Sequence, residues 1–66
     1  MNIQMLKGKI VERGLNVDSV ASKMGINRAS LYRKLRGGEK ITIGEAAKIK
    51  EALNLSEEEA MAIFFN

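Results

Sequence analysis

Four cations with no acid between them lie in the segment 28–36, namely Arg28, Arg33, Lys34 and Arg36. A guanidinium group donates two parallel hydrogen bonds to a phosphate, or to the O6 and N7 atoms of a guanine. A solvated helix usually mixes acids with bases, because opposite charges pair at the i, i+4 spacing. A cationic face without acids suits a polyanion instead. The segment therefore points to nucleic-acid recognition.

The composition excludes most catalytic chemistry. The 66-residue chain has no histidine and no cysteine, which are the usual general bases, nucleophiles and transition-metal ligands. Asp18 and Ser19 fit the first turn of a helix better than a catalytic pair, and Gly37-Gly38 fits a helix stop better than a phosphate loop. We therefore expect a protein that is not an enzyme, with no cofactor, no metal site and no small-molecule ligand.

The charge is divided unevenly along the chain. Residues 1–36 hold eight Lys or Arg against two acids, a balance of +6, and residues 37–66 hold three Lys against six Glu, a balance of −3. The positive half suits a polyanion, with ordinary surface solubility as the alternative. We find no stretch of about 18–20 apolar residues and no signal-peptide core, so we expect an intracellular protein without a membrane partner.

The chain is predicted to be all-α, a single compact domain over residues 1–66 with five short helices. Apolar residues recur at helical spacing in the groups Ile3, Leu6, Ile10, Val11; Val17, Val20, Ala21, Met24; Leu31, Leu35; and Ala46, Ile49, Leu53. Asn16 and Asn27 are good caps, and Thr42/Glu45 and Ser56/Glu59 have the spacing of capping boxes. Gly14, Gly25 and Asn54 are natural stops. The expected helices cover about residues 2–13, 17–24, 27–36, 42–53 and 57–65.

The second and third of these helices have the pattern of a helix-turn-helix. Two short helices joined by a glycine-containing turn define that motif, and residues 17–36 fit it with Gly25-Ile26 at the corner. The small Ala21 lets the two helices cross closely, while Leu31 and Leu35 fix the second helix on the first. The same sharp corner also occurs in helical proteins that never contact DNA.

The outward face of helix 28–36 supplies the candidate contacts. A nine-residue helix is about 13 Å long, which matches a DNA major groove about 12 Å wide. Arg28 and Arg33 are the candidate base readers, and Ala29 can lie against a thymine methyl group. The DNA-backbone candidates are Asn16, Asn27, Ser30, Tyr32, Arg36 and Lys40. For Asn16 and Asn27 capping alone is an alternative, and for Tyr32 so is packing.

A family resemblance rests on the same residues. The run VASKMGINRASL (20–31) resembles the helix-turn-helix of lambda-repressor-like regulators, also called Cro/C1-type or XRE. With KIVERG (9–14), SLYRKLRGG (30–38) and ALNLSEEEAMAIFF (52–65), the chain is similar to short Cro-like and repressor-like proteins of temperate phages of Gram-positive bacteria. The run NRASLYRKL also resembles the recognition helix of Fis-type proteins, but the flanking helices favour the phage regulators.

The resemblance implies a five-helix bundle that binds operator DNA as a dimer and controls transcription in the bacterial cytoplasm or a phage-infected host, associated with the nucleoid. It implies base contacts at positions that correspond to Arg28, Ala29 and Arg33. The chain departs from the family pattern at Lys34, where many members carry the second apolar anchor. Leu35 is expected to take this role, which would rotate the recognition helix slightly.

The last helix is the candidate dimer contact. Apolar residues crowd its end, namely Met61, Ile63, Phe64 and Phe65. One helix of a small domain cannot bury side chains on so many faces, so we expect one phenylalanine to pack inward and the rest to contact a symmetry mate. The alternative is that all four close the core of the monomer. A protein-binding antitoxin or antirepressor with the same fold is the alternative function.

Overall fold

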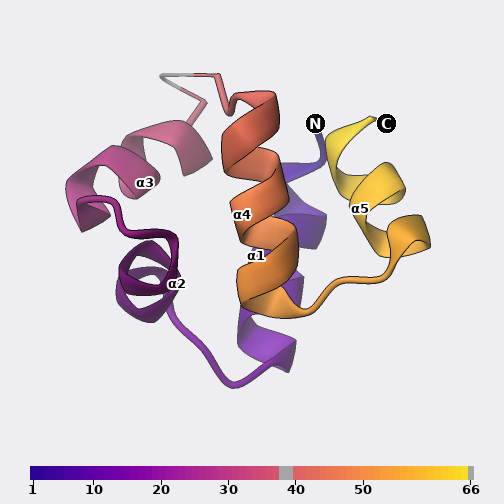
Figure 1. Cartoon of the computed structure of the whole chain (residues 1–66), viewed down its shortest axis with the longest axis horizontal. Helices are drawn as coiled ribbons and strands as arrows, with labels where there is room; N and C mark the ends of the chain where they lie inside the picture. The colour runs from indigo at the N-terminus through magenta and orange to yellow at the C-terminus, as the bar shows by residue number, and fades with distance from the viewer. Residues whose placement is uncertain (38–39, 66) are drawn as a thin grey trace.

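The computed structural model describes residues 1–37 and 40–65, and within these ranges it contains five α-helices and no strand. The helices are α1 (Ile3–Glu12), α2 (Val17–Met24), α3 (Arg28–Leu35), α4 (Ile43–Leu53) and α5 (Glu57–Phe64). α4 runs through the middle with α1 behind it, while α2 and α3 lie on one side and α5 on the other (Figure 1). The predicted all-α fold with five helices is confirmed. No helix of the described ranges has the length and apolarity to cross a membrane.

Side-chain caps explain where the five described helices begin. In each case a polar side chain accepts a hydrogen bond from a backbone N–H of the first turn; the capping residues are Asn2, Asn16, Asn27, Thr42 and Ser56. The two predicted capping boxes, Thr42/Glu45 and Ser56/Glu59, are present. A third box joins Asn16 to Ser19. Such caps are worth about 1 kcal/mol each, so local sequence fixes the boundaries of these short helices.

One cluster of buried apolar side chains holds all five helices together. Its members are Leu6, Ile10, Val20, Ala21, Met24, Leu31, Leu35, Ile49, Leu53, Leu55 and Ile63. The inward positions predicted for α2, for α3 and for Ile49 and Leu53 of α4 agree with this cluster. Val11 was expected on the inner face of α1 and is 75% exposed instead. That prediction is wrong because Leu6 and Ile10, one turn apart, already direct α1 into the core.

The corner between α2 and α3 depends on a left-handed glycine. Gly25 has φ 72°, and the next residue, Ile26, donates its backbone N–H to the carbonyl oxygen of Ala21 at 3.0 Å. Ala21 is only 1% exposed, as its predicted place at the helix crossing requires. The sharp turn therefore sets the angle at which α3 leaves α2.

We expect Gly25→Ala to lower the free energy of unfolding by about 1–2 kcal/mol, because a left-handed backbone strains any residue with a Cβ atom. A Cβ atom at Gly25 would meet nothing within 4 Å, so the cost is conformational. The control is Gly8→Ala inside α1, where the added Cβ also has open space and alanine should stabilise the helix by up to about 1 kcal/mol. Denaturant unfolding measures the free energy of unfolding of both variants. Equal values for Gly25→Ala and Gly8→Ala would contradict the expected strain at Gly25.

An ion-pair cluster joins α1 to α5. Lys9 Nζ lies 2.6 Å from Glu59 Oε2 and 3.1 Å from Glu12 Oε2, and Arg13 Nη2 lies 3.4 Å from Glu59 Oε1. Arg13 also donates from Nε to the carbonyl oxygen of Leu53 at 3.0 Å. The Lys9 hydrogen bond, followed by that from the backbone of Ser56, lowers the pKa of Glu59 from 4.5 to about 2. The end of α1 is therefore held to α5 by ion pairs and to the end of α4 by a hydrogen bond, in addition to the buried core.

This cluster predicts a loss of stability in acid. Because the pKa of Glu59 is lower in the fold than in the unfolded chain, its charge stabilises the protein above about pH 4.5, and this stabilisation is lost as the pH falls toward 2. Glu59→Gln keeps the capping-box geometry and removes the charge. We expect Glu59→Gln to melt below the wild type at pH 7, with the difference disappearing by about pH 2. Circular dichroism melts across this range test it, and a pH-independent difference would contradict it.

Candidate nucleic-acid interface

The exposed face of α3 gathers the arginines predicted from the sequence. A shallow hollow on this helix is lined by Arg28, Ala29, Tyr32, Arg33 and Arg36, and all five side chains are exposed. Leu31 and Leu35 point the other way, with 1% and 4% of their surface exposed. No acid occurs within α3 itself. The helix therefore presents a cationic outer face and an apolar inner one.

Arg28 is the first residue of α3, and its guanidinium is tied to α2. Its Nη1 atom lies 3.1 Å from Oδ2 of Asp18, and the two side chains are 70% and 52% exposed. The sequence indicates a first-turn position for Asp18 and gives no signal of this pair. Asp18 and Arg28 are ten residues apart and lie on different helices, so no spacing within one helix relates them. Only the angle between α2 and α3 brings the two groups together.

Arg33 lies five residues further along α3 and lines the same hollow. Its Nη2 atom donates to the hydroxyl oxygen of Ser30 at 3.2 Å, a bond between residues three apart on one helix. Ser30 is half-buried. The structure thus brings a predicted phosphate contact and a predicted base reader into direct contact, and this hydrogen bond restricts where the arginine side chain can lie.

The two asparagines predicted to contact the DNA backbone cap the helices of the motif. Asn16 Oδ1 accepts from the N–H of Ser19, and Asn27 Oδ1 accepts from the N–H of Ala29, both at 2.8 Å. The capping interpretation is therefore confirmed for both. A cap uses the side-chain oxygen, so the amide nitrogen can still donate to a phosphate, and such contacts stay a prediction.

Lys34, the cation at which the chain departs from the pattern that the resemblance implies, forms an ion pair with an acid of α4. Its Nζ atom lies 3.3 Å from Oε2 of Glu45 in the first turn of α4, and the side chains are 12% and 21% exposed. The backbone N–H of Thr42, followed by Lys34, lowers the pKa of the Glu45 carboxyl group. Leu35 occupies the core in place of an apolar residue at 34, as predicted. The pair therefore fixes the end of α3 to α4.

Comparison with family models decides the classification. The model described as the Cro/C1-type HTH DNA-binding domain matches residues 5–65, which includes all five helices except the first two residues of α1. The chain belongs to this family. Comparison with curated proteins and with solved structures gave no match.

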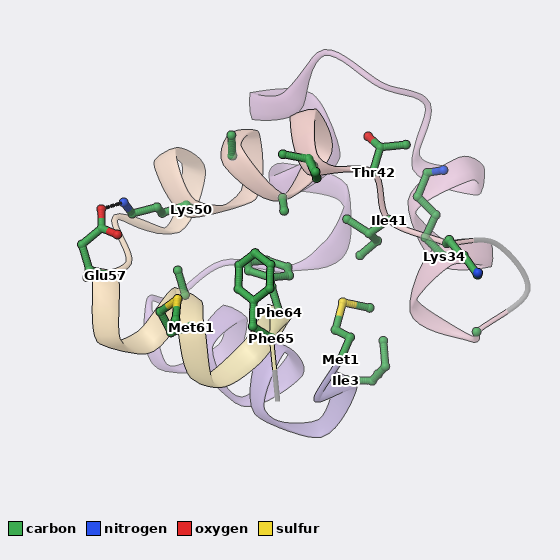
Figure 2. Close-up of a pocket in the computed structure, with 16 residues that line it drawn as sticks. Met1, Ile3, Lys34, Ile41, Thr42, Lys50, Glu57, Met61, Phe64 and Phe65 are labelled. Atoms are coloured by element: carbon green, nitrogen blue, oxygen red, sulfur yellow. Dashed lines mark hydrogen bonds and ion pairs between the residues drawn. The ribbon is translucent and has the colours of Figure 1, made fainter.

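A second surface of this Cro/C1-type domain is an apolar groove between the N-terminus, α4 and α5 (Figure 2). The groove has a volume of about 630 Å³. Four large apolar side chains on it are exposed, namely Ile43 (85%), Phe65 (71%), Met61 (57%) and Met1 (45%). Figure 2 shows Phe64 and Phe65 side by side at its centre. Ile43 and Met1 are not among the residues predicted from the sequence for this surface, because neither belongs to the apolar end of the last helix.

The groove changes one of the predicted dimer contacts. Ile63 has no exposed surface, because it points from α5 into the core and its carbonyl oxygen accepts the N–H of Asn2 at 2.7 Å. The prediction that Ile63 contacts a symmetry mate is therefore wrong. Phe64 is half-buried against the core, whereas Met61 and Phe65 are exposed. Of the four predicted residues, only Met61, Phe64 and Phe65 can contribute to a contact outside the chain.

Lys40 and Tyr32 complete the set of predicted contacts. Tyr32 keeps 43% of its surface exposed and lies in the arginine hollow of α3. Lys40 is exposed, precedes the start of α4 and lines the apolar groove; it is not among the residues that line the hollow. Within the described ranges, no group of three acidic residues could hold a metal ion.

Proposed function

We propose that this Cro/C1-type domain is a sequence-specific transcriptional regulator of the phage Cro or repressor type, acting in the bacterial cytoplasm on nucleoid or phage DNA. It binds operator DNA with α3 in the major groove. The observation that carries the proposal is the orientation of α3, with its arginines exposed and Leu31 and Leu35 buried. The eight residues of α3 are about 12 Å long, and the major groove of DNA is about 12 Å wide.

The contacts divide by chemistry. Arg28 and Arg33 read guanine through two parallel hydrogen bonds, and Ala29 contacts a thymine methyl group. The remaining polar residues contact phosphates and fix the register without reading sequence; they are Asn16, Asn27, Ser30, Tyr32, Arg36 and Lys40. The capped helix beginnings at Asn16 and Asn27 support this division, because backbone N–H groups at a helix N-terminus attract anions.

The regulator binds as a homodimer through the apolar groove. Two α3 helices related by two-fold symmetry read half-sites about 34 Å apart. Exposed Met61, Phe65 and Ile43 together make a patch of the kind that marks an interface. A second copy buries these apolar side chains, while Lys50 and Glu57 at one end of the groove pair with each other (Figure 2).

Selection of binding sites from random double-stranded DNA tests the proposal. We expect the purified protein to recover a palindromic consensus with two half-sites one helical turn apart. The logarithm of its affinity should fall linearly with the logarithm of the salt concentration, because bound cations release counterions from DNA. Recovery of no consensus, with equal affinity for every sequence, would contradict sequence-specific regulation.

The groove also favours a second candidate function. An antitoxin or antirepressor with this fold would use the same exposed apolar side chains to hold another protein. Co-purification of a stoichiometric protein partner, together with no DNA binding at low salt, would support this alternative. A DNA consensus and a self-associating chain would exclude it as the main role.

A further inference from the structure

An acid stands beside the recognition helix, where it should weaken DNA binding. Asp18 is the second residue of α2 and is 52% exposed. A carboxylate near a phosphate backbone repels it. Its contact is the guanidinium of Arg28 at 3.1 Å, the residue that opens α3. The single acid of α2 and the first cation of α3 therefore form a pair across the corner of the helix-turn-helix.

The geometry of a guanidinium lets one arginine serve two partners. The group is planar and carries five N–H donors in a rigid fork. Asp18 accepts from Nη1, and the remaining donors still provide the parallel pair that a guanine accepts. A carboxylate on one edge therefore fixes the plane of the group without occupying the whole of it. Base readers need such support, because a side chain that is free to rotate reads its base poorly.

We propose that Asp18 is a specificity-determining positioning residue. It holds the guanidinium of Arg28 for guanine readout and, by its charge, lowers the affinity for DNA of any sequence. This inference rests on the proposed function and adds to it a residue outside α3. Asp18 therefore raises the preference for the selected base and lowers the affinity for DNA in general. On random DNA only the second effect acts, whereas on the selected site the two effects oppose each other.

The pair gains strength when the complex forms. In water an exposed ion pair contributes little, because solvent screens it. Docking of α3 displaces water from Arg28, and attraction between charges increases as the surrounding dielectric falls. The ion pair between α2 and α3 thus becomes effective at the point where the base is read, although it contributes little to the stability of the free protein.

The experiment compares Asp18→Ala with a matched control. Glu58→Ala removes the same charge from the same position of another helix, because Glu58 is the second residue of α5 and is also exposed. We expect Asp18→Ala to raise affinity for random DNA about 2- to 5-fold at low salt. Preference for guanine over the other bases, at the base pair that Arg28 reads, should fall about 5-fold. Glu58→Ala should leave that preference unchanged.

A double-mutant cycle separates positioning from charge. Arg28→Lys keeps the cation and loses the fork, so it should reduce preference at the same base pair. Adding Asp18→Ala to Arg28→Lys should then change the preference no further, which is the sign of two residues acting as one unit. Circular dichroism melts confirm that each variant is folded before its binding is measured.

The outcomes separate this inference from the proposed function. If Asp18→Ala raises affinity for all sequences alike and leaves base preference unchanged, Asp18 acts through charge alone and the positioning role is overturned. The positioning role is also overturned if Asp18→Ala and Arg28→Lys reduce the base preference additively. If the wild type itself selects no consensus, the proposed function fails instead, whatever the variants do.

Discussion

Ile43→Glu should convert the regulator into a folded monomer that binds a two-half-site operator about 10²–10⁴-fold more weakly. Linking two binding units raises apparent affinity by about this factor, and separating them loses it. Ile43 is 85% exposed at the edge of the groove, so a charge there opposes burial against a second copy. The fold should tolerate the change, because Ile43 is the first residue of α4 and the helix dipole favours an acid at that end.

A matched pair of variants tests whether the effect belongs to the groove. Phe65→Glu introduces the same charge at the residue that follows the last turn of α5, which is 71% exposed. Val11→Glu exchanges an apolar residue for the same acid on α1, at 75% exposure and away from the groove. Phe65→Glu should behave as Ile43→Glu does, and Val11→Glu should remain a dimer with wild-type affinity for the operator.

Two measurements are needed. Sedimentation equilibrium gives the oligomeric state, and titration of DNA with one or two half-sites gives the affinity. The groove variants should bind a single half-site as the wild-type monomer does, because the arginine face of α3 is untouched. If Ile43→Glu and Phe65→Glu both remain dimers with full operator affinity, the groove is not the dimer interface and the second copy must contact another surface.

Local sequence predicts much of this fold. A capping side chain marks the beginning of each described helix, and in α2, α4 and α5 a second side chain three residues later completes a capping box, as at Thr42 and Glu45. The helix starts therefore follow from a few consecutive residues. The burial of Leu31 and Leu35 also follows from their spacing, and with it the exposure of the arginine face. These features depend on interactions within one helical turn, which are encoded in consecutive residues.

Contacts between elements are less accessible to such reasoning. The pairs Asp18–Arg28 and Lys34–Glu45 join residues ten and eleven positions apart, and their formation depends on how the helices cross. Ile63 shows the same limit, since four large apolar residues lie in and just after the last turns of α5 and only the docking of α5 on α1 decides which of them is buried. The groove is a product of that docking.

In the proposed function, sequence specificity depends on the reading of bases, and Arg33→Ala should show it. Loss of a bidentate contact to guanine costs roughly 1–3 kcal/mol on the selected operator and relaxes the preference at one base pair. Affinity for random DNA should fall by much less, because most of that affinity comes from phosphates. The Ser30 hydroxyl, which accepts from Arg33 at 3.2 Å in the free protein, supports a fixed side chain at this position.

Two further variants distinguish base reading from charge. Arg33→Lys keeps the cation and loses the fork, so it should retain affinity for random DNA and the slope of affinity against salt while losing the preference at the same base pair. Lys48→Ala removes one exposed cation from α4 and leaves α3 unchanged, so its consensus should be that of the wild type. Equal losses on operator and random DNA for Arg33→Ala would make Arg33 a phosphate contact, and Arg28 would then be the one remaining candidate for guanine recognition on α3.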